Sequence, residues 1–146
     1  MNKTAILVLG APRSGTSLIS NIICEIGINF GDPKRFVDPN IHPWNPIFFE
    51  LQSLNNLNDE VIRGLGSEYL DADCMPLKED FNTDFIERYK TEIMQFIERE
   101  FDGANVIGMK DPRFCITLPL WLTVLRKLGY TVKLIWVVRN ISSCLA

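Results

Sequence analysis

The run Ala5-Ile6-Leu7-Val8-Leu9 passes directly into Gly10-Ala11-Pro12-Arg13-Ser14-Gly15-Thr16-Ser17, and this stretch decides the fold. The five apolar residues predict a buried strand, and the apolar spacing from Leu18 to Ile26 predicts an amphipathic helix. A glycine-containing loop between a strand and a helix presents several backbone N–H groups at one point, where a phosphate can bind. The stretch therefore predicts an α/β protein with an anion site near its first helix.

The loop has the two-glycine frame of a phosphate-binding loop, with a hydroxyl residue at Ser17. Thr16 stands where nucleotide triphosphatases carry a lysine after the second glycine. A phosphate cradle without that lysine indicates a different donor chemistry, and Arg13 offers a cation from inside the loop.

Length and composition describe one folded domain over residues 1–146. The hydrophobic content of 47% argues against disorder, and no apolar run approaches the roughly 20 residues of a membrane helix. The four cysteines (Cys24, Cys74, Cys115 and Cys144) show no C-x-x-C spacing. We therefore expect no metal site and no disulfide framework, and a reducing cytoplasm fits.

The net charge of −3 conceals an uneven distribution. From Gly103 onward the chain carries six basic residues and one acid, Asp111. This basic segment favours an anion site, although a solvated basic face is the alternative. The overall acidity gives no support for nucleic-acid binding.

Hydrophobic periodicity predicts alternating strands and helices. Strands are expected over 4–9, 106–109 and 131–138. Helices are expected over 14–26, 46–65 and 118–128, and a further helix is expected to begin at a cap formed by Asn82 or Thr83. The residues over 28–46 and 66–80 are expected to form loops. The stripe from Phe85 to Ile97 is expected to be core. Apolar strands alternating with helices predict a parallel sheet covered on both faces, in a three-layer α/β/α fold of the P-loop type.

Charged residues follow the end of each predicted strand. Arg13 follows the first strand, Lys110, Asp111 and Arg113 follow the second, and Arg139 follows the third. In open parallel sheets ligands bind beyond the carboxyl ends of the strands. We therefore expect these groups to meet at one edge of the sheet.

Three motifs resemble those of sulfotransferases that use 3′-phosphoadenosine 5′-phosphosulfate (PAPS). Residues 10–17 resemble the family's P-[KR]-[ST]-G-[ST]-[ST] loop, Lys110-Asp111-Pro112-Arg113 resembles the KDPR segment of bacterial-type members, and Val137-Val138-Arg139-Asn140 resembles the strand end that opens the 3′-phosphate motif. The Asn45-Pro46-x-x-Phe49-Glu50 stretch is similar to a segment near the family's acceptor site.

The resemblance implies a residue set for sulfuryl transfer without a metal. The donor-binding residues would be Pro12, Arg13, Ser14, Gly15, Thr16, Ser17 and Arg139. The backbone N–H groups of residues 13–17 would hold the 5′-phosphate, and Arg139 the 3′-phosphate. Arg13 would neutralise charge on the leaving oxygen, and Lys110 would steady the sulfonate. Asp111 would hold Arg113 or Lys110 in place, or act as a base; a structural ion pair between Asp111 and Arg113 is the alternative.

A base must accept the proton of the acceptor hydroxyl or amine. Glu50 is the first choice, Asp111 the second and His42 the third. Trp44, Phe48 and Phe49 are candidates for an acceptor pocket, with core packing as the alternative.

The sequence also departs from the family. Leu18 replaces the tryptophan that stacks on adenine in cytosolic small-molecule members, and Lys110-Asp111-Pro112 replaces their K-T-H segment. The serine eight residues after Arg139 would fall at position 147, so the chain is expected to be the N-terminal portion of such a domain, truncated at its C-terminus. Ser142 or Ser143 is a substitute for it.

Two other function classes stay open: a P-loop small-molecule kinase that needs ATP and magnesium, and a truncated, non-catalytic nucleotide-binding module. The acceptor could be a small molecule, a glycan, a lipid or a protein tyrosine. Apolar surface left by a missing half would favour a homo-oligomer.

Overall fold

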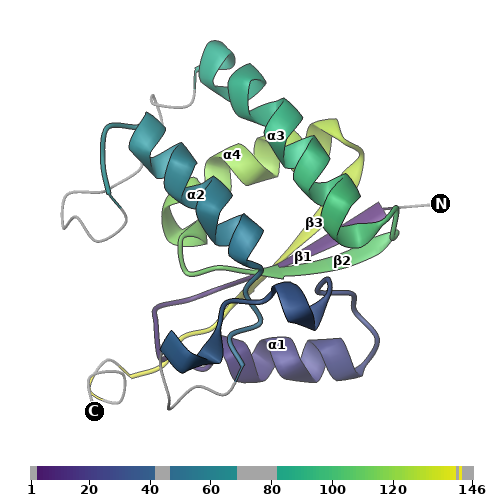
Figure 1. Cartoon of the computed structure of the whole chain (residues 1–146), viewed down its shortest axis with the longest axis vertical. Coiled ribbons are helices and arrows are strands. Elements are labelled where there is room, and N and C mark those ends of the chain that lie inside the picture. The colour runs from purple at the N-terminus through teal and green to yellow at the C-terminus, as the bar shows by residue number, and fades with distance from the viewer. Residues whose placement is uncertain (1–2, 42–46, 69–81, 141, 143–146) are drawn as a thin grey trace.

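The computed structural model describes residues 3–41, 47–68, 82–140 and 142, and Figure 1 shows its arrangement in three layers. The elements are β1 (Lys3–Leu9), α1 (Thr16–Glu25), two 3-10 helices (Pro33–Arg35 and Pro39–Ile41), α2 (Gln52–Gly64), α3 (Thr83–Phe101), β2 (Val106–Lys110), α4 (Phe114–Lys127) and β3 (Tyr130–Trp136). Helix α1 covers one face of the sheet, and α2, α3 and α4 lie on the other (Figure 1).

The sheet is parallel throughout and has the order β2-β1-β3. Thr4 of β1 pairs with Val106 on one side and with Thr131 on the other. The predicted parallel sheet and the three-layer α/β/α class are therefore confirmed. Because β1 is central, the loop that follows it lies between the carboxyl ends of both neighbouring strands.

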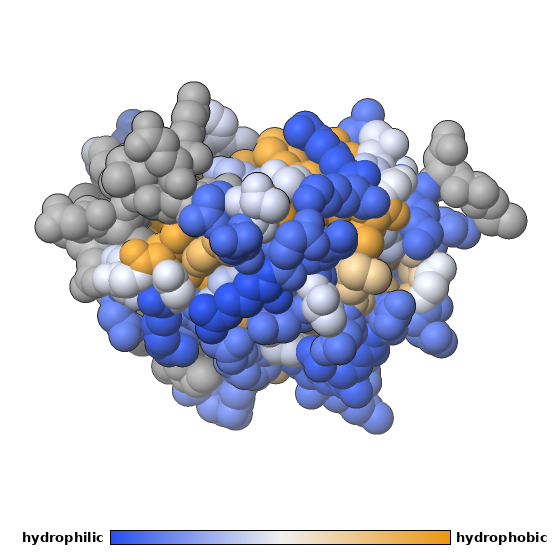
Figure 2. Space-filling view, turned by 90° about the horizontal axis from the view of Figure 1, so that it is seen from above, coloured by the Kyte–Doolittle hydropathy of each residue, from blue (hydrophilic) through white to orange (hydrophobic). Residues whose placement is uncertain are grey.

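Two apolar clusters hold the layers together. On the α1 face, Val8 packs with Ile23 and Phe30. On the opposite face, the larger cluster includes Leu7 and Trp121, both with no exposed surface. Figure 2, seen from the side of α2 to α4, shows a mainly hydrophilic outer surface with smaller hydrophobic areas between. Burial of these two clusters holds the helices against the sheet, and the candidate site lies at the carboxyl edge of that sheet.

Helix α3 follows the sequence prediction closely. The Asn82 side chain accepts a hydrogen bond from the Phe85 N–H over 2.9 Å, as an N-terminal cap does. The predicted stripe is core: Tyr89, Ile93, Phe96 and Ile97 are buried.

The starts of two other helices differ from the prediction. Helix α1 begins at Thr16, two residues late, since Gly15 has a φ of 101°. Helix α4 begins at Phe114, four residues early, because Phe114, Ile116 and Thr117 face the core. Pro119 thus lies inside this helix, whereas the prediction had placed it in the first turn.

The expectation that residues 46–65 form one helix is also wrong at its start. Helix α2 begins at Gln52, because the preceding residues make tertiary contacts instead. Phe49 has a φ of 56°, outside the helical region, and Leu51 forms an antiparallel bridge with Phe36. Glu50 therefore precedes the helix rather than opening it.

Strand β3 is not covered on both faces. Leu134 is 47% exposed and Trp136 is 75% exposed, on the same face as the larger core cluster. The strand ends at Trp136, two residues before the predicted end. The apolar run predicted full cover, but α4 shields only the beginning of the strand, where Tyr130 is buried.

In the described ranges, no helix has the length and apolar character that crossing a bilayer requires. The predicted loop over 66–80 lies mostly outside these ranges. The substitute Ser143 also lies outside them, whereas Ser142 is described.

Candidate anion site at the sheet edge

The loop after β1 has a backbone that depends on glycine at two points. A Cβ atom on Gly10 would lie 2.6 Å from the Val137 carbonyl oxygen and 2.9 Å from Ser14 Oγ, so a side chain has no room there. Gly15 has a φ of 101°, and a Cβ there would meet nothing within 4 Å. The loop is therefore packed against the segment after β3 at its beginning and open at its end.

Arg13 adopts a φ of 65°, a left-handed conformation that non-glycine residues rarely adopt. The turn around it closes when the Ser14 N–H donates to the Ala11 carbonyl oxygen over 3.1 Å. Such a conformation costs about 1–2 kcal/mol, and strained residues of this kind cluster at functional sites.

Helix α1 begins directly after the loop, and no side chain caps it at Gly15. The first N–H groups of a helix have no intrahelical partner and carry a partial positive charge. Ser14 Oγ is buried and makes no hydrogen bond in the described part of the chain. A buried hydroxyl without a partner beside a helix N-terminus is the arrangement that an anion would complete.

The expected convergence of charged residues occurs for Lys110 and Arg139, whereas Asp111 and Arg113 join a separate cluster with residues of α2. Lys110 Nζ, at the end of β2, donates to Ser17 Oγ over 3.4 Å. Arg139, after β3, donates from Nη1 to the Arg13 carbonyl oxygen over 3.3 Å. The loop is thus flanked by cations from both neighbouring strands. Three of the predicted donor-binding residues are exposed: Pro12, Arg13 and Arg139. Thr16, by contrast, is buried in the first turn of α1.

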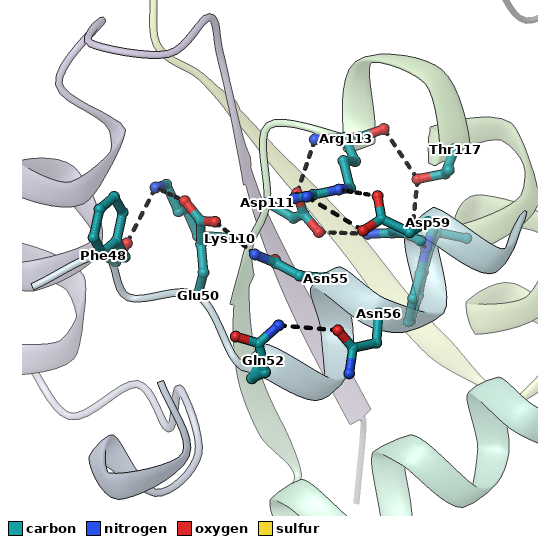
Figure 3. Close-up of polar contacts among 12 residues, drawn as sticks. Phe48, Glu50, Gln52, Asn55, Asn56, Asp59, Lys110, Asp111, Arg113 and Thr117 are labelled. Atoms are coloured by element: carbon teal, nitrogen blue, oxygen red, sulfur yellow. Dashed lines mark hydrogen bonds and ion pairs between the residues drawn. The ribbon is translucent and has the colours of Figure 1, made fainter. Parts of the chain in front are cut away.

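Lys110 and Glu50 form a buried ion pair through Nζ and Oε1. Lys110 also donates to the Phe48 carbonyl oxygen over 3.1 Å, and Asn55 Nδ2 donates to the second carboxylate oxygen of Glu50 over 3.1 Å (Figure 3). Phe49 has a left-handed backbone conformation and lies between Phe48 and Glu50, the two residues that accept from Lys110. The ring of Phe49 packs on that of Phe36, with centroids 5.6 Å apart. Phe49 is core, and the pocket role of Phe48 stays a prediction.

Asp111 belongs to a second polar cluster, and its side chain has no exposed surface. Its Oδ1 accepts from the Arg113 backbone N–H and from Nη1, and its Oδ2 accepts from Asn58 Nδ2 over 2.8 Å. Burial raises the pKa of Asp111 to about 6; Arg113 opposes this rise and the Glu50 charge adds to it. Of the two partners expected for Asp111, Arg113 is the one it contacts.

Asn58 and Asp59 complete this cluster from α2, and sequence reasoning missed their roles. Asn58 Oδ1 accepts from Thr117 Oγ1 and from Trp121 Nε1, over 2.9 and 2.7 Å. Asp59 pairs with Arg113 on the other side (Figure 3). One signal was available: Asn58 falls on the apolar side of the helix predicted over 46–65, where a polar residue needs buried partners.

His42, Trp44 and the Asn45-Pro46 pair lie outside the described residues. Among those described, no cluster of three or more His, Cys, Asp or Glu side chains has the arrangement of a metal site. Cys24 is a free thiol.

The chain matches no protein-family model, and comparison with curated proteins and with solved structures likewise found no match. The resemblance of three motifs to those of sulfotransferases therefore stays a prediction from the sequence.

Proposed function

We propose that this chain carries the donor site of a PAPS-dependent sulfotransferase. One observation carries the proposal: the open loop between β1 and α1 holds the unpartnered Ser14 hydroxyl and the exposed Arg13, and Arg139 reaches it from the segment after β3. A phosphate cradle with two exposed arginines is suited to a donor that carries phosphates at two positions.

The residues fit such a donor. The hydroxyls of Ser14 and Thr16 and the first N–H groups of α1 would hold the 5′-phosphate, where Gly15 leaves open space. The guanidinium of Arg139 would bind the 3′-phosphate, for which its planar fork of donors is suited.

PAPS, when bound, supplies the sulfuryl group that is transferred to a hydroxyl or amine. Arg13 stabilises negative charge at the loop, and the helix N-terminus adds to this stabilisation without any metal. Lys110 holds the Ser17 hydroxyl at the first turn. Glu50 and Asp111 are both buried and both accept hydrogen bonds from protein groups on each carboxylate oxygen, so an acceptor would have to reach either of them inside the protein.

The acceptor would be a small molecule, a glycan or a lipid. The reaction would take place in the cytoplasm, because the four cysteines lack the spacing of a disulfide framework. A small-molecule kinase is the second enzyme class, and Thr16 in place of the phosphate-binding lysine argues against it.

Isothermal titration calorimetry with adenosine 3′,5′-bisphosphate tests the proposal. We expect saturable binding that Arg13→Ala weakens while circular dichroism shows an intact fold. Tighter binding of ATP with magnesium would favour the kinase. Absence of bisphosphate binding would refute the donor site. Sulfate transfer from labelled PAPS would exclude a non-catalytic binding module.

A further inference from the structure

The ammonium group of Lys110 is fully committed to acceptors inside the protein. An ammonium has three N–H donors. Lys110 Nζ has three acceptors: Ser17 Oγ at 3.4 Å, the Phe48 carbonyl oxygen at 3.1 Å, and Glu50 Oε1. The residue is only 5% exposed. Lys110 therefore links the end of β2 to the first turn of α1 and to the segment before α2.

Glu50 is held as firmly as the lysine. One carboxylate oxygen accepts from Lys110, and the other accepts from Asn55 Nδ2 in the first turn of α2 (Figure 3). Glu50 is 6% exposed, so its charge is balanced by Lys110 and not by solvent. A carboxylate placed in this way is suited to fixing an ammonium group, whereas a base needs an oxygen that faces the acceptor.

Ser17 depends on this pair for its orientation. Its Oγ accepts from Lys110 and donates to the Phe48 carbonyl oxygen over 3.3 Å. Ser17 is the second residue of α1 and the last residue of the loop. Lys110 and the Phe48 carbonyl oxygen, which also accepts from Lys110, therefore set the orientation of the Ser17 hydroxyl in the first turn of α1.

We infer that Glu50 is a positioning residue, which acts through Lys110 to hold the Ser17 hydroxyl at the anion site. This inference rests on the proposed function of the loop and specifies how that site is built. It gives Glu50 a role other than proton acceptor. It also makes Lys110 a neutralised crosslink, so that the free positive charge at the loop comes from the two exposed arginines, Arg13 and Arg139.

Bisphosphate affinities of four proteins test the inference: wild type, Glu50→Gln, Lys110→Met and the double variant. We expect Glu50→Gln to weaken binding by about tenfold, and the double variant to bind within about twofold of Lys110→Met alone, because both changes act through one ammonium group. An unchanged affinity in Glu50→Gln, or effects that simply add, would overturn the positioning role.

Urea unfolding of the same proteins separates positioning from a purely structural effect. Each single variant leaves one buried charge unpaired, whereas the double variant leaves none, so its stability should exceed that of both single variants. If Glu50 is a positioning residue, the double variant regains stability but not bisphosphate affinity. Recovery of both stability and affinity in the double variant would overturn the positioning role. Glu100→Gln is the matched control, since Glu100 is a buried carboxylate whose partners are Arg35, Arg99 and Ser53. It should leave the affinity unchanged.

NMR spectroscopy tests the role of Glu50 even if the wild type binds no bisphosphate. Absence of bisphosphate binding would refute the proposed function but not the link between Glu50 and Ser17. Glu50→Gln should shift the Ser17 amide and Hβ resonances in NMR spectra, as Lys110→Met does, and Glu100→Gln should not. Unmoved Ser17 resonances in Glu50→Gln would refute the inference about Glu50.

Discussion

Arg139 donates a hydrogen bond from Nη1 to the carbonyl oxygen of Arg13 across 3.3 Å, although 126 residues separate the two in sequence. The bond attaches the segment after β3 to the loop after β1. It places the guanidinium of Arg139 against the backbone that we propose to bind a phosphate.

Replacing Arg139 tests that placement. Arg139→Ala should weaken bisphosphate binding by at least about tenfold, because a charge-assisted hydrogen bond contributes roughly 1.5–3 kcal/mol. Calorimetry measures the change. Arg126→Ala removes an exposed arginine from the last turn of α4 and should leave the affinity unchanged. Equal losses in both variants would mean that overall charge, and not the position of Arg139, governs binding.

Gly10→Ala should destabilise the fold through steric contact. The added Cβ would lie 2.6 Å from the Val137 carbonyl oxygen, which belongs to the backbone and cannot rotate away. Overpacking of this kind costs about 1–3 kcal/mol, measurable by urea unfolding. Wild-type stability in this variant would show that the loop and the segment after β3 separate easily in solution.

Asn58→Leu should destabilise the protein by about 3 kcal/mol or more. The change removes the amide group that hydrogen-bonds to Thr117, Trp121 and Asp111. Each buried polar group that loses its partner costs about 1–3 kcal/mol. Asn56→Leu, two residues away on the exposed side of α2, should stay within about 0.5 kcal/mol of wild type. Chemical denaturation of both variants gives the comparison; similar values would contradict the central role of Asn58.

Asp111 should make stability fall as pH rises. Its pKa rises from 3.8 to about 6 in the folded protein, so between these values the folded chain holds a proton that the unfolded chain releases. The free energy of unfolding attributable to this group is therefore fully present below about pH 4 and is lost by up to about 3 kcal/mol as pH rises through 6.

The measurement is urea unfolding between pH 4 and 7 for wild type and Asp111→Asn. The variant lacks the titrating group, so the difference in stability between the two proteins should fall with increasing pH. Carboxylates that do not interact with Asp111, such as Glu87 with its lowered pKa, contribute equally to both proteins and cancel. A difference independent of pH would show that Asp111 is already ionised at pH 4.

The sequence was sufficient to predict what depends on local pattern. Apolar runs and glycines mark the strand, loop and helix around Gly10 and Gly15. The alternation of apolar strands with helices predicted that the sheet is parallel. The meeting of Lys110 and Arg139 at the loop followed from the topology alone, because both residues come after parallel strands.

Contacts between distant segments decided the rest, and no local pattern encodes them. The start of α2 is delayed because Phe49 turns away so that Phe48 and Glu50 face Lys110. The exposure of Trp136 depends on where α4 ends over the sheet, which the apolar sequence of β3 does not indicate. The bond between Asn55 and Glu50 was likewise hidden, whereas the place of Asn58 on the apolar side of the predicted helix signalled a buried partner without identifying Asp111.

The central position of β1 also governs when the anion site can be completed during synthesis. Lys110 is translated 93 residues after Ser17, and Arg139 is translated 126 residues after Arg13. At about 5–20 residues per second, the ribosome needs roughly 6–25 seconds to supply the later partner. During that interval β1 is an apolar segment with two unpaired edges, which favours aggregation.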